Sequence, residues 1–240
     1  MYEERFYREY MKADNFINFT VIDKESDLHI SAKTNLVKEA KQYLEKYRTA
    51  IKDYGDNDTE FYKSLVPLEV SKDADEIVKH MAEAANHANV GPMAAVAGAV
   101  SQYVGLDLLN YTDEIIIENG GDIFIKTNKR RKILIYAGNS PFSEKIALSI
   151  SPEDTPLGIC TSAGTIGHSI SFGKADAVVV LSKDTLLADA TATAIGNIIK
   201  DPDDINKGIE YGKAIEGIEG ILIIIEDKMG AWGKIELVKP

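Results

Sequence analysis

The sequence predicts an α+β fold in which helices pack on a mostly antiparallel, mixed sheet. Segments that alternate apolar and polar residues across short turns indicate β-hairpins, and they occur near both ends of the chain. Apolar residues at helical spacing follow the first hairpin and recur later. The 240 residues are 45% hydrophobic, which is enough for a core. We therefore expect a single domain spanning residues 1–240.

The first part of the chain reads as a hairpin followed by a helix. Residues 1–12 form a short strand or helix with no evident partner. Residues 15–23 and 27–33 alternate in polarity around Lys-Glu-Ser, as paired strands do. Residues 34–54 carry apolar side chains at helical spacing. The sequence Tyr-Gly-Asp-Asn-Asp is expected to end that helix.

The centre of the chain passes from helices to strands. Residues 73–105 divide into two helices at Gly91-Pro92, because glycine ends helices and proline opens them. The second of these helices is rich in Ala and Gly and nearly uncharged, so it should be buried with close backbone contacts. Strands are predicted over residues 114–127, interrupted by a turn, and over 132–138 and 145–151.

The last part of the chain begins with a continuous apolar strand over residues 175–182. Helices are predicted over 185–197 and 203–215, and a closing hairpin over 220–238.

Charge and cysteine content narrow the range of partners and compartments. The formal net charge is −11, so a nucleic-acid partner is not expected. An anionic small molecule would need a metal ion or a helix N-terminus to bind. The single cysteine, Cys160, suits a reducing compartment. No apolar run is long enough to cross a membrane, and the first residues lack a signal-peptide core. We expect a cytoplasmic protein without a membrane partner.

The helix over 185–197 places three polar residues on one face. Asp189, Thr193 and Asn197 lie within about 80° of one another at 100° per residue. One interpretation is that they hydrogen-bond to neighbouring loops. Alternatively, the carboxylate and hydroxyl oxygens of Asp189 and Thr193 would suit Mg²⁺, which in turn holds substrate phosphates.

Two further stretches could contact a ligand. Asn119-Gly120-Gly121-Asp122 is either a hairpin turn or a bare backbone surface on which a ligand lies, with Asp122 pointing into a pocket. Residues 158–173 read as a loop whose N–H groups and hydroxyls suit an anion. Within that loop, His168 is a structural residue, a ligand contact or a proton carrier, and Cys160 is a small core residue or a nucleophile.

In this order, "NGGDI", "TSAG" and "LADATATAIG" resemble the ApbE family of flavin transferases (FAD:protein FMN transferases), in particular a short cytosolic branch of archaea and anaerobes. The resemblance covers about residues 90–240, after the hairpin and helix of residues 1–60. It implies that Asp189 and Thr193 bind Mg²⁺ beside the FAD pyrophosphate, with the backbone carbonyl of Ala94 as a further ligand. The expected flavin contacts are Asn119, Gly120, Gly121, Asp122, Thr161, Ser162 and Gly164, and the expected catalytic residues are His168 and Cys160.

Three functions follow from this reading. The first is a Mg²⁺-dependent flavin-nucleotide protein, either a transferase with an acceptor protein or an FAD pyrophosphatase. The second is a factor in sulfide assimilation and homocysteine formation, an association of the branch, in which nearby N–H groups lower the pKa of Cys160. The third is a ligand-binding relative without catalysis. The sequence leaves open whether the chain forms a homo-oligomer.

Overall fold

The computed structural model describes residues 15–164 and 173–240, which are built around an antiparallel sheet of eight strands. The strand order is β1-β2-β3-β4-β7-β8-β9-β10. These strands are β1 (Ile17–Asp23), β2 (Ser26–Ala32), β3 (Ile115–Asn119), β4 (Asp122–Lys126), β7 (Leu157–Ser162), β8 (Ala177–Ser182), β9 (Ile218–Ile225) and β10 (Lys228–Gly233). A smaller sheet joins β11 (Leu237–Val238), β6 (Ala147–Ile150) and β5 (Arg131–Leu134). All pairings among these strands are antiparallel, and the α+β prediction is confirmed.

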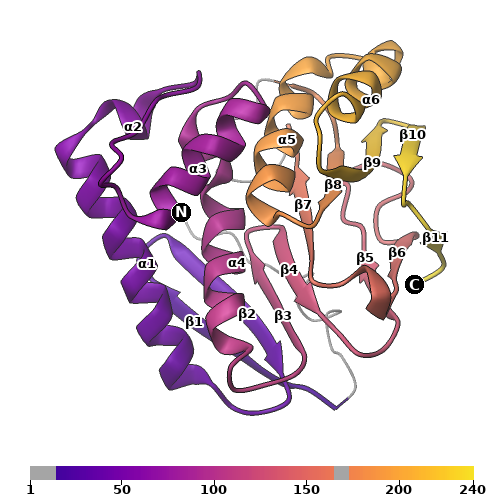
Figure 1. Cartoon of the computed structure of the whole chain (residues 1–240). Coiled ribbons are helices and arrows are strands. Elements are labelled where there is room, and N and C mark those ends of the chain that lie inside the picture. The colour runs from indigo at the N-terminus through magenta and orange to yellow at the C-terminus, as the bar shows by residue number, and fades with distance from the viewer. Residues whose placement is uncertain (1–14, 165–172) are drawn as a thin grey trace.

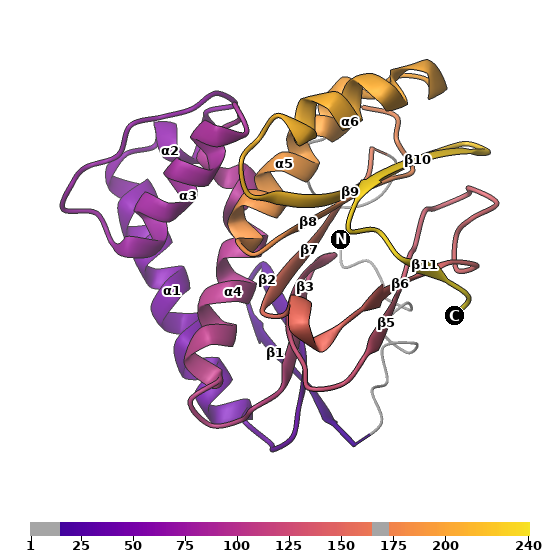
Figure 2. The same cartoon turned by 45° about the vertical axis from the view of Figure 1, so that its right-hand side comes forward.

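The helices cover one face of the large sheet, and the small sheet lies against the other face (Figures 1 and 2). The helices are α1 (Val37–Asn57), α2 (Glu60–Lys63), α3 (Glu76–His87), α4 (Val96–Leu108), α5 (Thr185–Ile198) and α6 (Ile205–Lys213). Short 3₁₀ turns are η2 (Pro92–Ala95), η3 (Pro152–Asp154) and η4 (Pro202–Asp204). Within the described ranges, no helix has the length and apolar character that a bilayer crossing demands.

Two apolar cores follow from the alternation of side chains along the strands. One core lies between the large sheet and the helices and contains Cys160 and Phe124. The other lies between the two sheets and contains Leu157 and Ile159. Residues on β7 therefore alternate between the two cores, and the same holds for β4. This alternation decides which side chains of these strands can face α4 and α5.

The structure confirms the first hairpin and the segment in which the following helix ends. β1 and β2 pair in full register, from Ile17 with Ala32 to Asp23 with Ser26. α1 ends at Asn57, inside the Tyr-Gly-Asp-Asn-Asp segment that was expected to end it. The ring of Tyr62 packs against Gly55 in the last turn of this helix, and a Cβ there would lie 2.2 Å from that ring.

Two other segments differ from the prediction. The closing hairpin ends at Gly233, and residues 237–238 instead pair with β6 in the small sheet. The first turn after Gly91 is the 3₁₀ turn η2, and the α-helix begins at Val96. The predicted element at residues 1–12 lies outside the described residues.

Candidate site between the helix pair and the glycine turn

Helices α4 and α5 pack with their backbones in contact. A Cβ on Gly98 of α4 would lie 2.5 Å from the carbonyl oxygen of Thr185 and 2.9 Å from Cβ of Asp189. No side chain larger than hydrogen fits at that distance. The expected close backbone contact of the Ala/Gly-rich helix is confirmed, and it places Asp189 at the beginning of α4.

Each of these two helices caps the other. Oδ2 of Asp189 accepts a hydrogen bond from the backbone N–H of Gly98 at 2.8 Å. In return, Oε1 of Gln102 on α4 accepts from the backbone N–H of Thr185, the first residue of α5, at 2.7 Å. The first N–H groups of a helix lack partners within that helix, so both bonds satisfy otherwise unpaired donors. These two hydrogen bonds also fix the position of α5 along the axis of α4.

The two-glycine segment is a tight hairpin turn that reaches the beginning of α4. Gly120 and Gly121 have φ values of 69° and 107°, which is the left-handed backbone that favours glycine. Asn119 pairs with Asp122 across the turn, and its Nδ2 donates to the carbonyl oxygen of Ala97 at 3.2 Å. The hairpin interpretation is therefore confirmed, and the turn lies beside the residues that Asp189 caps.

Asp122 and Asp189 form a pair of buried carboxylates. Their residues are 7% and 8% exposed. Burial, followed by the charge of Asp189, raises the pKa of Asp122 well above its usual range. Burial raises the pKa of Asp189 to about 7, although N–H groups of Gly98 and Ala97 oppose the shift. Among the described residues, no lysine or arginine is a main influence on either pKa. Two buried acids without a basic partner favour either a shared proton or a bound cation.

The predicted loop at residues 158–173 begins as a strand. Residues 157–162 form β7, which pairs with β4 on one side and β8 on the other. Most of its backbone takes part in the ladder, but the backbone N–H of Thr161 donates to Oδ1 of Asp122 at 3.3 Å, so one N–H group of the predicted loop faces a carboxylate. Thr161 pairs with Val179 and faces the core between the sheets, whereas Ser162 pairs with Val178 and faces the helices. Oγ of Ser162 is buried and has no hydrogen-bond partner among the described residues.

The other predicted site residues lie on several elements. Ala94 is half-buried on η2, and Thr193 is half-buried on α5, one helical turn after Asp189. The backbone N–H of Gly164 donates to the carbonyl oxygen of Ala175 at 2.9 Å. His168 lies outside the described residues. The structure thus gathers Asn119, Asp122 and Asp189 around the beginning of α4.

Cys160 lies beside the two carboxylates but is fully enclosed. It is 0% exposed, and its Sγ is 3.4 Å from the carbonyl oxygen of Thr185. Burial, followed by the charges of Asp122 and Asp189, raises the pKa of the Cys160 thiol well above its usual range. The expectation that N–H groups lower this pKa is wrong, because burial and the neighbouring carboxylates both raise it.

We accordingly expect native Cys160 to react slowly with a thiol reagent. Both burial and a raised pKa disfavour the thiolate that attacks such reagents. At pH 8 the labelling rate should be about a hundredfold or more below that of the guanidinium-unfolded chain, because reaction requires opening of the core. Equal rates in the native and unfolded chains would contradict this assignment.

Gln102 and Gly98 were not predicted as site residues. Gln102 is 8% exposed and is a polar residue within an apolar helix. That contrast is the sequence signal that could have identified it, since buried amides need partners. The role of Gly98 was implied only by the general composition of its helix.

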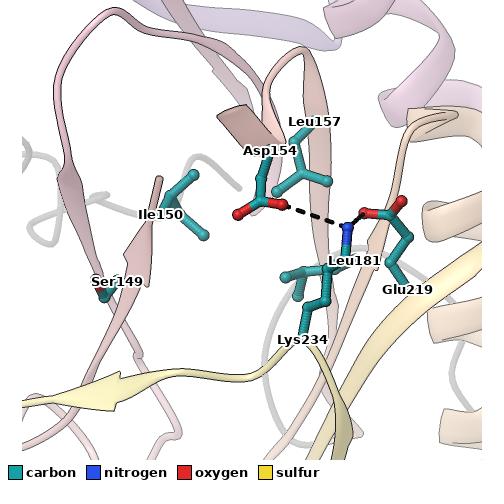
Figure 3. Close-up of a pocket in the computed structure, with 7 residues that line it drawn as sticks. All are labelled: Ser149, Ile150, Asp154, Leu157, Leu181, Glu219 and Lys234. Atoms are coloured by element: carbon teal, nitrogen blue, oxygen red, sulfur yellow. Dashed lines mark hydrogen bonds and ion pairs between the residues drawn. The ribbon is translucent and has the colours of Figure 1, made fainter. Parts of the chain in front are cut away.

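A small pocket lies on the other side of the large sheet (Figure 3). Its apolar wall includes Leu157 and Leu181, which belong to the core between the sheets. Nζ of Lys234 lies 3.3 Å from both Asp154 Oδ1 and Glu219 Oε2 at its rim. Because this pocket lies on the face of the sheet opposite to the helices, it is separate from the carboxylate pair.

The fold is that of an ApbE-like protein. A family model described as "AbpE bacteria" matches residues 8–231. The chain is 45% identical over 206 residues to a UPF0280 protein of Methanococcus aeolicus, covering 83% of each chain. It is 41% identical over 226 residues to a UPF0280 protein of Methanocaldococcus jannaschii, covering 91% of this chain and 92% of that one. The chain therefore belongs to the family that this model describes.

Solved structures show the same fold at low sequence identity. The flavin transferase ApbE from Vibrio cholerae matches with a TM-score of 0.61 and 13% identity, covering 90% of this chain and 96% of that one. The ApbE protein from Thermotoga maritima matches with a TM-score of 0.58 and 11% identity, with the same coverage. The ApbE-like fold predicted from the sequence is confirmed.

Proposed function

We propose that this chain binds the flavin dinucleotide FAD through a Mg²⁺ ion held beside α5. The observation that carries the proposal is the pair of buried carboxylates, Asp122 and Asp189. Among the described residues, no lysine or arginine is a main cause of the pKa shift of either one. A solved neighbour of the same fold is titled a flavin transferase, which supports the choice of ligand.

A magnesium ion suits a site that offers few charged ligands. Among the described residues, no group of three or more His, Cys, Asp or Glu side chains could hold a metal ion. Mg²⁺ is commonly bound by one or two carboxylates together with substrate phosphates and water. Asp189 and Thr193 would hold the ion, with the carbonyl of Ala94, and phosphate oxygens would complete the set. The ion would also offset the repulsion between a pyrophosphate and a chain of net charge −11.

The protein groups around the ion would position the dinucleotide. The Gly120–Gly121 turn offers backbone without side chains, so a ligand can approach it closely. Asn119 fixes this turn to α4 through Ala97. Gly98 and Gln102 fix α5 relative to α4 and so set the position of Asp189. When bound, Mg²⁺ withdraws charge from phosphate oxygens and eases departure of a nucleotide.

The reaction that suits this site is cleavage of the FAD pyrophosphate. An acceptor hydroxyl on a protein, or water, would bond to the phosphorus of the FMN half while the bond to AMP breaks. The proton of the attacking hydroxyl would pass to a base, for which His168 is the candidate. Transfer to a protein would make the chain a flavin transferase, and transfer to water would make it a pyrophosphatase.

Replacing Asp189 with asparagine tests this function. The amide oxygen can still accept from Gly98, so the cap of α4 is retained while the charge is lost. We expect Mg²⁺-dependent FAD binding to weaken about a hundredfold, as losses of metal-site groups commonly do. Fluorescence titration of FAD, with and without EDTA, measures this effect.

The control for charge is Asp203→Asn, an exposed acid on η4. It should leave FAD affinity unchanged. Two results together would overturn the proposal: FAD binding by the unaltered chain that EDTA does not weaken, and equal FAD affinity in Asp189→Asn. Chromatographic detection of AMP separates catalysis from binding alone.

The non-catalytic alternative predicts Mg²⁺-dependent binding without AMP. The described residues do not favour the sulfur-assimilation alternative, because the thiol of Cys160 is fully buried and its pKa is raised.

A further inference from the structure

The beginning of α5 is held by a residue from a third helix. Asp184 precedes α5, and its Oδ1 accepts from the backbone N–H of Leu186 at 3.0 Å. Its Oδ2 lies 2.9 Å from Nε2 of His80 on α3. The carboxylate thus caps α5 with one oxygen and contacts α3 with the other. His80 thereby restrains the orientation of the residue that caps α5.

A second contact fixes the ring of His80. Nδ1 lies 3.3 Å from the hydroxyl of Tyr103 on α4, and the two rings meet edge to face with centroids 5.9 Å apart. Burial raises the pKa of Tyr103 to about 12, so this hydroxyl keeps its proton at neutral pH. Neutral His80 can donate from Nε2 to Asp184 and accept from Tyr103 at Nδ1, and protonated His80 can donate at both nitrogens. The ring position is therefore compatible with both protonation states.

These contacts converge one helical turn before Asp189. Leu186 is capped through Asp184, and Thr185 is capped by Gln102 of α4. Asp189 follows Thr185 by four residues, which is about one turn. A shift of the first turn of α5 would carry the Asp189 carboxylate away from Gly98. Contacts from α3 and α4 with the first turn of α5 thus determine where this carboxylate lies.

We infer that His80 is a positioning residue for the cation site, acting through Asp184 on the first turn of α5 and so on Asp189. The link from α5 to a cation rests on the proposed function. The link from His80 to α5 rests on the contacts alone. The two links can be tested separately, because the first concerns ligand affinity and the second concerns the helix itself.

Two substitutions of His80 separate its two contacts. In His80→Gln, the amide nitrogen can reach the place of Nε2 and keep the bond to Asp184. In His80→Asn, the shorter amide can replace Nδ1 and keep the contact with Tyr103, but it loses Asp184. The inference predicts that His80→Asn disturbs α5, whereas His80→Gln behaves as the unaltered chain.

Hydrogen exchange and Mn²⁺ binding provide the two measurements, at a temperature where circular dichroism shows every variant folded. We expect exchange of the amides at residues 185–190 to be about tenfold faster in His80→Asn. We also expect Mn²⁺ affinity, measured by electron paramagnetic resonance, to fall about tenfold, in the range found for groups that orient metal ligands. His80→Gln should restore both values.

Each outcome has a definite meaning. Unchanged exchange in His80→Asn would overturn the inference, as would equal losses in His80→Asn and His80→Gln. Faster exchange with unchanged Mn²⁺ affinity would overturn the link between His80 and the site. If the unaltered chain binds no Mn²⁺, the proposed cation site fails, and the exchange data alone decide whether His80 positions α5.

Discussion

Replacing Gly98 with alanine is expected to lower the free energy of unfolding by about 3 kcal/mol, at the upper end for an added methyl group in a packed interior. The new Cβ would lie 2.5 Å from the Thr185 carbonyl oxygen, which is backbone and cannot rotate away. Helices α4 and α5 must then separate, and the bond from Gly98 to Asp189 lengthens. Urea unfolding followed by circular dichroism measures the change in stability.

The same substitution should weaken Mg²⁺-dependent FAD binding if the proposed function holds, because Asp189 moves with α5. Leu106→Ala, on the same helix at a position that is 47% exposed, provides the control and should change stability by less than about 1 kcal/mol. A Gly98→Ala chain as stable as the unaltered one would show that the two helices are less closely packed than described.

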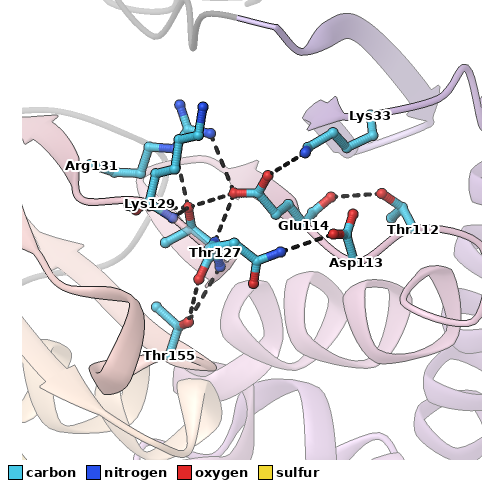
Figure 4. A network of polar contacts seen from close by, with 9 residues as sticks. Lys33, Thr112, Asp113, Glu114, Thr127, Lys129, Arg131 and Thr155 are labelled. Atoms are coloured by element: carbon cyan, nitrogen blue, oxygen red, sulfur yellow. Dashed lines mark hydrogen bonds and ion pairs between the residues drawn. The ribbon is translucent and has the colours of Figure 1, made fainter.

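Replacing Glu114 with glutamine is expected to cost about 3 kcal/mol at pH 7. The Glu114 side chain is 1% exposed and lies 2.7 Å from Nζ of Lys33 and 3.5 Å from Nη2 of Arg131 (Figure 4). It also accepts from Thr127 and from the backbone N–H of Asn128. Although burial opposes ionisation, these partners lower the pKa of Glu114 from 4.5 to about 2. At 1.36 kcal/mol per pKa unit, that difference gives the expected cost.

The pH dependence of this contribution follows from the lowered pKa. The folded chain holds the Glu114 proton less tightly than the unfolded chain does, so ionised Glu114 favours folding. Its contribution is fully present above about pH 4.5, and it is lost as the pH falls towards about 2. The stability difference between the unaltered chain and Glu114→Gln should therefore shrink across this window.

Urea unfolding at pH 7 and at pH 3 measures this change. Asp113→Asn is the matched control, since Asp113 is adjacent but exposed and accepts only a surface bond from Asn128 in the described network. Its stability difference from the unaltered chain should not shrink between pH 7 and pH 3. A difference for Glu114→Gln that stays constant between the two pH values would contradict the assignment.

The sequence was sufficient to predict those parts of the fold that depend on local patterns. Alternation between residues 15 and 33 predicted the first hairpin, and Gly91-Pro92 predicted the division between α3 and α4. Tyr-Gly-Asp-Asn-Asp predicted the segment in which α1 ends, but the packing of the Tyr62 ring against Gly55 is a contact that no local pattern encodes.

The candidate site was predictable only in part. Asp189 stood out as a carboxylate within an apolar helix, and the paired glycines predicted the turn beside it. Thr161 and Ser162 were assigned to one ligand-binding loop, but a strand places neighbouring side chains on opposite faces. Gln102 and His80 act through partners that lie 83 and 104 residues away respectively, and a single sequence cannot pair residues so far apart.

The mutual capping of α4 and α5 has a consequence for how the chain acquires its site. The two bonds join residues 91 and 83 positions apart in the sequence. Contacts of such separation require closure of a long loop before they contribute to stability. A nascent chain that stops before β7 therefore lacks both bonds, and the N–H of Gly98 in the first turn of α4 lacks its carboxylate partner. Ligand affinity should consequently arise in one cooperative step, when the last third of the protein docks.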